Sequence, residues 1–260
     1  MLSYQHAYHA GNLADLHKHS VLAELLARLT AKPRGLTYLD THAGRGLYDL
    51  AAPEALKTGE AAQGIGRVAA PDPASPFGRA LAAIRAAHGD TAYPGSPAIA
   101  RALLRPQDRL VLCDLHPAEH AALRRHLAGE GVAIHRADGF QTGLALAPFA
   151  PRKGLVLVDP SYEVKSDYEA TAAFARRLLA KWPEATLLIW FPLLPAGRHA
   201  ALLAGLAPLP HRVDAVAFYP APARGMTGSG LALVNPPHGA ETAFEAPLRL
   251  AGPLLRRTTP

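Results

Sequence analysis

The 260-residue sequence predicts an α/β protein built on a mainly parallel β-sheet, and three observations support this. Apolar runs without alternation, such as residues 154–158, are typical of strands covered on both faces. Segments with helical spacing of apolar residues lie between these runs, which is the order of repeated βαβ units. Acidic residues follow several runs, where open α/β sheets bind their ligands.

A chain of this length suits one large α/β domain or one domain with an insertion. We expect residues 1–50 to hold an N-terminal polar lip, the first helix and the first strand of the sheet. Residues 51–93 form short amphipathic pieces broken by glycine and proline, which predicts a helical insertion. Residues 94–260 would complete the main domain.

Composition limits the class of protein. No apolar stretch approaches the ~20 residues of a membrane span, and the N-terminus lacks the apolar region of a signal peptide. We therefore expect a cytoplasmic protein with no membrane partner, and we expect a monomer without an obligate protein partner. The single cysteine, Cys113, excludes an intrachain disulfide. The net charge of +6 favours a polyanionic partner.

The N-terminal segment from Tyr4 to His19 is unusually rich in polar residues, including four histidines. A metal site is one hypothesis for such a cluster, but no cysteine and no ordered set of carboxylates accompanies the histidines. We therefore expect no metal and interpret the segment as a polar lip over an active site. A helix is predicted behind it, over residues 21–29, where apolar residues recur on one face.

The first predicted strand, residues 36–40, ends at Asp40 and is followed by Gly44 and Gly46. Glycines allow a backbone to approach a ligand closely. The turn lacks the third glycine and the later acid of the dinucleotide fingerprint, which weighs against a nicotinamide dehydrogenase. An acid before such glycines is instead typical of the S-adenosylmethionine pocket of Rossmann-like methyltransferases.

The alternation of strands and helices resumes after the insertion, where Ser96 is predicted to cap a helix. Asp114 and Asp138 lie just past two apolar runs, so both would reach one edge of a parallel sheet, where they could hold ribose hydroxyls and an adenine amine. Ordinary strand-ending acids are the alternative. The remaining predictions are helices over 98–104, 117–127, 168–179 and 197–206, and strands over 109–114, 132–136, 185–191, 212–219 and, as the last one, 231–234.

The most informative stretch is the buried strand 154–158 with the turn Asp159-Pro160-Ser161-Tyr162 behind it. The carboxylate of Asp159 and the carbonyl of Pro160 can each accept one N–H of a planar exocyclic amine, which favours a pyramidal nitrogen with its lone pair directed outward. Tyr162 could stack on the base, a contact worth ~1–3 kcal/mol. The alternative is that Asp-Pro only opens a turn.

Two later segments are ambiguous. The run Asn235-Pro236-Pro237-His238 is similar to this turn but lacks the aromatic residue, and we interpret it as structural. Residues 224–230 form a basic, flexible loop that is either an RNA contact or a plain hairpin connection.

Six motifs in this order resemble the bacterial 23S ribosomal RNA adenine N6-methyltransferase family called RlmJ. They are Leu2-Ser-Tyr4-x-His6-x-x-His9-Ala-Gly-Asn12, Asp40-Thr-His-Ala-Gly44, Pro94-Gly-Ser-Pro97, Ala137-Asp-Gly139, Asp159-Pro-Ser-Tyr162 and Arg224-Gly-Met-Thr227. The resemblance covers residues 2–237. Ser161 stands where many relatives have a second proline, and Asp114 where some have glutamate.

The resemblance implies a Rossmann-like class I S-adenosylmethionine-dependent methyltransferase sheet with a small helical insertion. It implies S-adenosylmethionine as cofactor, 23S rRNA as partner, and adenine 2030 as the methylated base. The implied catalytic residues are Asp159, Pro160, Tyr162, Tyr4, His6 and Lys18, and the implied cofactor-binding residues are His19, His42, Gly44, Ser96, Asp114, Asp138 and Gly139. Two alternatives stay open: a DNA adenine N6-methyltransferase, and a non-catalytic nucleic-acid-binding protein for DNA uptake or use.

Overall fold

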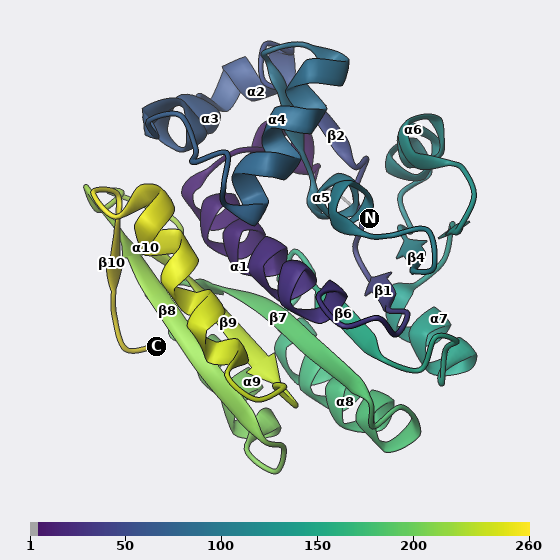
Figure 1. Cartoon of the computed structure of the whole chain (residues 1–260). Coiled ribbons are helices and arrows are strands. Elements are labelled where there is room, and N and C mark those ends of the chain that lie inside the picture. The colour runs from purple at the N-terminus through teal and green to yellow at the C-terminus, as the bar shows by residue number, and fades with distance from the viewer. Residues whose placement is uncertain (1–4) are drawn as a thin grey trace.

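The computed structural model describes residues 5–260, which fold around an eight-stranded sheet (Figure 1). The strand order is β10-β8-β9-β7-β6-β1-β4-β5. Strands β5, β4, β1, β6 and β7 are parallel, whereas β9 runs antiparallel to both neighbours and β10 antiparallel to β8. The bounds are β1 Thr37–Asp40, β4 Arg109–Cys113, β5 Val132–His135, β6 Gly154–Val158, β7 Ala185–Leu193, β8 His211–Phe218, β9 Gly228–Val234 and β10 Leu255–Arg257.

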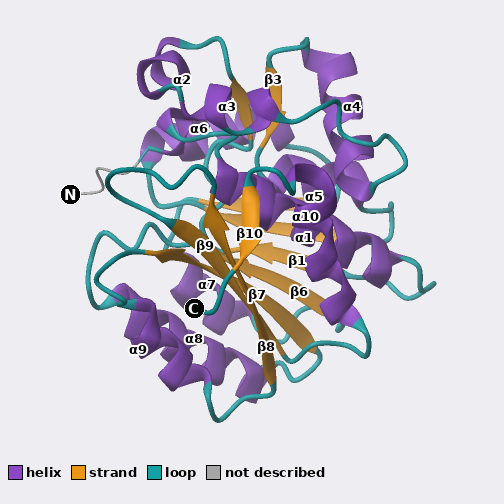
Figure 2. Ribbon diagram, turned by 90° about the vertical axis from the view of Figure 1, so that its left-hand side faces the viewer, coloured by secondary structure: helices purple, strands orange, loops and turns teal. Residues whose placement is uncertain are grey.

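Helices cover both faces of the sheet, which confirms the predicted α/β class (Figure 2). Leu155 and Leu157 of β6 pack into one core with α1 (Leu13–Thr30), α5 (Ser96–Leu103) and α10 (Ala246–Ala251). Val156 and Val158 pack into the other with α7 (Gly139–Leu146), α8 (Asp167–Lys181) and α9 (His199–Leu206). Successive strand residues point to opposite faces, so a strand between two helical layers has to be apolar throughout.

The order of the parallel strands contains a switch point. From β1 the chain moves outward through β4 and β5, and it then returns to the other side of β1 to form β6 and β7. Ligands of open α/β sheets bind outside the carboxyl ends of the strands at such a point. The topology thus places Asp40, at the end of β1, next to Asp159, directly after β6.

The segment predicted as a helical insertion contains α2 (Pro53–Thr58), α3 (Glu60–Gln63) and α4 (Pro76–His88). It lies between β2 (Leu47–Asp49) and β3 (Ala92–Pro94), which pair as a separate two-stranded sheet. The division of the chain into three domains stays a prediction. No helix in the described part of the chain is long and apolar enough to span a membrane.

The structure corrects several predicted boundaries. Helix α1 begins at Leu13, well before the predicted residues 21–29, because Asn12 caps it by accepting the backbone N–H of Asp15. Ser96 does not cap its helix; Gly95 precedes α5, and Ser96 is the first helical residue. Strand β7 continues through Pro192. Residues 231–234 are not the last strand, because the 3-10 helix Ala240–Glu245, α10 and β10 follow. Helix α7 was not predicted.

Candidate active site

A cavity of about 790 Å³ opens at the carboxyl ends of the parallel strands. Every predicted site residue that the structure describes lines this cavity: His6, Lys18, His19, His42, Gly44, Ser96, Asp114, Asp138, Gly139, Asp159, Pro160 and Tyr162. Tyr4, the remaining one, lies outside the described residues. The cavity therefore collects residues from α1, from the loops after β1, β4, β5 and β6, and from the start of α5.

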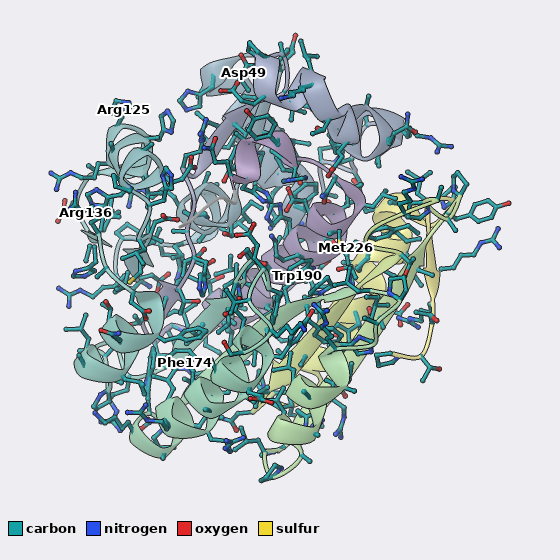
Figure 3. All side chains as sticks on the ribbon, turned by 180° about the vertical axis from the view of Figure 1, so that it is seen from behind. Asp49, Arg125, Arg136, Phe174, Trp190 and Met226 are labelled. Atoms are coloured by element: carbon teal, nitrogen blue, oxygen red, sulfur yellow. The ribbon has the colours of Figure 1, made fainter. Side chains whose placement is uncertain are left out.

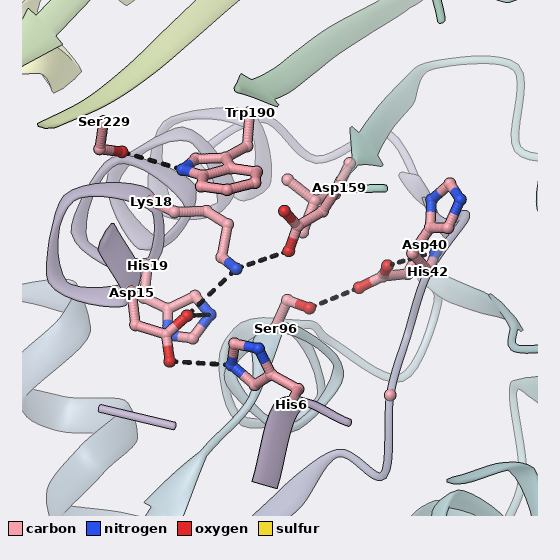
Figure 4. A network of polar contacts seen from close by, with 12 residues as sticks. His6, Asp15, Lys18, His19, Asp40, His42, Ser96, Asp159, Trp190 and Ser229 are labelled. Carbon is pink, nitrogen blue, oxygen red and sulfur yellow. Dashed lines mark hydrogen bonds and ion pairs between the residues drawn. The ribbon is translucent and has the colours of Figure 1, made fainter. Parts of the chain in front are cut away.

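A buried ion cluster forms one wall of the cavity (Figure 4). The Lys18 ammonium lies 2.5 Å from Asp159 Oδ2 and 3.1 Å from Asp15 Oδ1. Asp15 also accepts the backbone N–H of Gly11 at 2.9 Å, and its Oδ2 lies 3.0 Å from His6 Nε2. Because a buried charge is tolerated when it is paired and hydrogen-bonded, this part of α1 can be polar and still lie inside the fold.

The pKa values of this cluster follow from burial and charge. Burial would raise the pKa of Asp15, but His6 and the Lys18 ammonium outweigh it and hold the value well below the usual range. Burial also raises the pKa of Asp159, and Lys18 opposes this effect only in part. For Lys18, burial lowers the pKa, but the carboxylates of Asp159 and Asp15 raise it by more, so the pKa lies above its usual value. Lys18 therefore stays protonated, and Asp159 takes up a proton at a higher pH than Asp15 does.

The position of Asp40 before the glycine turn predicted a residue of the cofactor pocket, but the structure gives Asp40 a different place. It is fully buried and does not line the cavity. Its Oδ2 accepts the hydroxyls of Ser96 at 2.7 Å and of Tyr38 at 2.8 Å, and burial raises the pKa of the carboxyl to about 6. Asp40 thus holds the start of α5 beside β1, and Ser96 reaches the cavity from there.

The loops after β4 and β5 place two carboxylates along the cavity. Asp114 accepts the backbone N–H groups of Gly44 and His116, both at 2.8 Å, and Asp138 caps α7 by accepting the N–H of Gln141 at 2.9 Å. An ionised carboxylate has about four acceptor positions. Both side chains can therefore accept further donors from a ligand, such as ribose hydroxyls or an amino group.

Gly139 has a structural reason to be glycine. A Cβ atom at this position would lie 2.1 Å from the backbone oxygen of Thr41. The start of α7 thus passes directly against the loop after β1, and both border the cavity. Nearby, burial lowers the pKa of His42 to about 4 and that of His19 to about 3, so both imidazoles are neutral.

Two aromatic residues lie where the cavity meets the antiparallel strands. Tyr162 is only 5% exposed and has a positive φ of 55°, a strained conformation for a bulky residue that is common at functional sites. Its ring stacks on Tyr168 with centroids 4.4 Å apart, and its hydroxyl donates to the backbone oxygen of Trp190 at 2.7 Å. The stacking role expected for Tyr162 stays a prediction, and its low exposure limits the area it can offer.

Trp190 was missed from the sequence because it lies inside the predicted strand 185–191. Its side chain is half-buried and lines the cavity together with Met226. Figure 3 labels both residues. Residues 228–230 belong to β9, so only the earlier part of the expected flexible loop is a loop. The sole sequence signal for Trp190 was an indole beside Phe191 at the end of a mostly aliphatic run.

The donor set suits an organic cofactor. Across residues 5–260, no three histidine, cysteine or acidic side chains are grouped to hold a metal ion. The volume is within the ~300–1,000 Å³ of small-molecule sites. Carboxylates for hydroxyl and amino groups lie beside apolar ring surface, since Phe140 lines the same part of the cavity near Asp138.

Comparison with known proteins agrees with this geometry. A family model described as "Ribosomal RNA large subunit methyltransferase D, RlmJ" matches residues 33–257. Ribosomal RNA large subunit methyltransferase J of Haemophilus influenzae is 36% identical over 94% of this chain and 91% of its own, and that of Escherichia coli is 36% identical over 91% and 88%. The crystal structure of protein LPL1258 from Legionella pneumophila is 31% identical, with a TM-score of 0.82 over 96% of this chain and 97% of that one.

The fold and the site thus define a class I S-adenosylmethionine-dependent methyltransferase, as the sequence resemblance implied. Within this class the chain belongs to the RlmJ family of ribosomal RNA large subunit methyltransferases.

Proposed function

We propose that the protein methylates N6 of an adenine in 23S rRNA, adenine 2030 by family resemblance, and that Asp159 engages the target amine. The observation that carries the proposal is the contact between Lys18 Nζ and Asp159 Oδ2 at the switch point of the sheet. The ammonium is an N–H donor at the position where an adenine amine would donate. The carboxylate is therefore already arranged to accept an N–H from the cavity side.

The residues would divide the reaction as follows. Asp159 and the Pro160 carbonyl accept the two N–H groups of the amine, so that its lone pair points away from the ring plane. S-adenosylmethionine supplies an electrophilic methyl group when bound. The nitrogen would gain this methyl group as the bond between the methyl carbon and the cofactor sulfur breaks and S-adenosylhomocysteine is released, and it would give up one proton to the Asp159 carboxylate that accepts its N–H. Lys18 has to leave Asp159 when the base enters, and Asp15 provides a second acceptor that keeps its ammonium paired.

We further propose that Asp114 and Asp138 hold hydroxyl and amino groups of the cofactor, with His19, His42, Gly44, Ser96 and Gly139 shaping its pocket. Burial raises the pKa of Asp114, and the backbone N–H groups of His116 and Gly44 oppose this rise.

Binding to rRNA would take place in the cytoplasm, and we propose that the protein acts as a monomer.

Methyl transfer from labelled cofactor to three substrates tests the proposal. The substrates are protein-free 23S rRNA, assembled large ribosomal subunits and duplex DNA, followed by nucleoside analysis of the product. We expect N6-methyladenine in 23S rRNA, either as protein-free RNA or within the large subunit. Methylation of DNA in preference to both RNA substrates would contradict the proposed substrate, and methyl at another adenine atom would contradict the role of Asp159.

A further inference from the structure

The antiparallel half of the sheet contains a buried hydrogen-bond chain that ends on the cavity wall, and Figure 4 shows its first contact, between Trp190 and Ser229. Trp190 Nε1 donates to Ser229 Oγ at 2.9 Å, Ser229 Oγ lies 2.9 Å from His17 Nδ1, and His17 Nε2 lies 3.2 Å from Asp214 Oδ2. His17 and Ser229 are fully buried. The chain joins β7, β9, α1 and β8, yet none of the contacts described for the reacting groups explains it.

The direction of this chain follows from its two ends. An indole N–H can only donate, so Ser229 Oγ accepts from Trp190; at the other end the Asp214 carboxylate can only accept, so the single N–H of a neutral His17 ring lies on Nε2 and its Nδ1 accepts the Ser229 hydroxyl. His17 then carries its proton on Nε2 and donates to the Asp214 carboxylate. Burial lowers the pKa of His17, which is consistent with a neutral ring. Each hydrogen bond of the chain therefore has an assigned donor and acceptor, and together they fix the plane of the Trp190 ring.

Trp190 and Tyr162 both line the cavity, and Trp190 is the more exposed of the two. Its side chain is half-buried, whereas Tyr162 is 5% exposed and has Tyr168 against its ring. The Lys18 ammonium lies 5.8 Å from the Trp190 ring centroid and 2.5 Å from Asp159. The indole therefore lies beside the place where the target amine would bind.

We propose that Trp190 is the aromatic surface that receives the target adenine, and that Ser229 and His17 are positioning residues that hold its ring. The proposal rests on the proposed adenine N6-methylation and deepens it. It assigns to this half of the sheet a task that neither the ion cluster nor the cofactor-binding carboxylates can perform, because they offer no flat apolar surface to a base.

The test is single-turnover methylation of protein-free 23S rRNA by Trp190→Leu and Trp190→Phe. Base stacking of ~1–3 kcal/mol corresponds to about a 5- to 150-fold change in apparent RNA affinity. We expect Trp190→Leu to weaken RNA binding within this range with cofactor affinity unchanged, and Trp190→Phe, which keeps a ring, to have a smaller effect. Unchanged RNA affinity in folded Trp190→Leu would overturn the proposal.

Ser229→Ala tests the positioning role through a double-mutant cycle. If Ser229 acts through the indole N–H, its loss weakens RNA binding in the wild-type protein and adds nothing in the Trp190→Phe background. Full additivity would contradict the role of Ser229. Ser20→Ala is the matched control, because Ser20 is a buried serine of α1 whose hydroxyl donates to backbone oxygens, including that of Leu16 at 2.7 Å. It should leave RNA affinity unchanged.

Fluorescence provides a readout that a purely structural role would not change. We expect RNA to quench the wild-type protein in the presence of S-adenosylhomocysteine, and the quench to disappear in Trp190→Leu, since the other tryptophan, Trp182, is fully buried. A quench that persists in Trp190→Leu would count against the proposal. Asp159→Ala separates the two levels: if it retains full transfer, the proposed site is wrong, whereas loss of transfer together with a normal Trp190→Leu variant would remove only the present proposal.

Discussion

Two proline turns of this protein look alike in sequence but follow strands that run in opposite directions, so they lie at opposite ends of the strands. Asp159-Pro160 follows β6, Asn235-Pro236 follows β9, and each turn contains a residue with positive φ, 55° at Tyr162 and 52° at Asn235. Strand β9 is antiparallel to β7, so Val234 pairs with Leu187 near the start of β7, whereas Val158 pairs with Ile189 further along it. Strand direction, which the tetrapeptides do not encode, decides which turn reaches the cavity.

The partners of the two turns differ accordingly. Asp159 faces the cation of Lys18. Asn235 instead donates through Nδ2 to the backbone oxygens of Pro183 at 2.9 Å and Ala185 at 2.7 Å, and its own backbone oxygen accepts the Thr186 hydroxyl. The first turn keeps an acceptor for a ligand, and the second uses its polar groups to join strand ends. Its interpretation as structural agrees with these contacts.

The largest expected effect is that of Asp159→Ala. A hydrogen bond to a charged group is worth ~1.5–3 kcal/mol, and each ~1.36 kcal/mol is tenfold in rate. Single-turnover transfer to 23S rRNA should fall by at least about 10- to 100-fold, with cofactor affinity retained. Calorimetry with S-adenosylhomocysteine is the control for folding and binding. Transfer at the wild-type rate would show that the turn after β6 is not the reacting one.

Lys18→Met should change the pH dependence of transfer. Asp159 accepts an N–H best when ionised, so the rate falls as pH drops through its pKa. Lys18 lowers this pKa, and its removal should therefore move the acid limb of the profile to higher pH. At pH values below the acid limbs of both proteins, the variant should be slower than the wild-type protein. The difference should be about tenfold for each pH unit between the two limbs.

The matched control is Lys18→Arg, which retains the charge and should keep the limb near its wild-type position. Profiles of single-turnover rate against pH test the two variants side by side. A limb at the same pH in Lys18→Met and the wild-type protein would mean that Asp159 is not the titrating group.

Asn235→Ala should affect stability and leave catalysis unchanged. The variant loses two hydrogen bonds to backbone oxygens, which predicts a loss of ~1–3 kcal/mol in unfolding free energy, measured by denaturant titration. The transfer rate per folded molecule should equal that of the wild-type protein. A variant that folds and binds cofactor but transfers no methyl would reverse the assignment of the two turns.

The smallest effect is expected for Ser161→Pro, which makes the first turn more like the second. The reaction requires the Pro160 carbonyl and the turn geometry, and no side-chain contact of Ser161 is involved in this scheme. Transfer should stay within about threefold of wild type, since a tolerated proline changes stability by only ~0.4–1 kcal/mol. A loss comparable to that of Asp159→Ala would show that the turn needs the serine itself.

These differences also show how far sequence reasoning reached. Strand β6 was predictable because burial on both faces demands an unbroken apolar run, and Asp159 because the run stops at a proline. The extent of α1 was not, because Asp15 and Lys18 look like surface residues until their partners from other segments are known. Asp40 fitted the expected pattern, yet its carboxylate is taken up by Ser96 and Tyr38. Trp190 depends on Ser229 and on His17, which are far from each other in the chain.

The contact between His17 and Ser229 has a consequence for synthesis on the ribosome. Its two residues are separated by 212 positions, so α1 emerges long before β9 can pair with β7 and bring the serine to it. Contacts of such long range form late, because a large loop has to close first. A nascent chain can therefore assemble β1, β4 and their acidic loops early, whereas the indole acquires its fixed orientation only after nearly the whole polypeptide has been made.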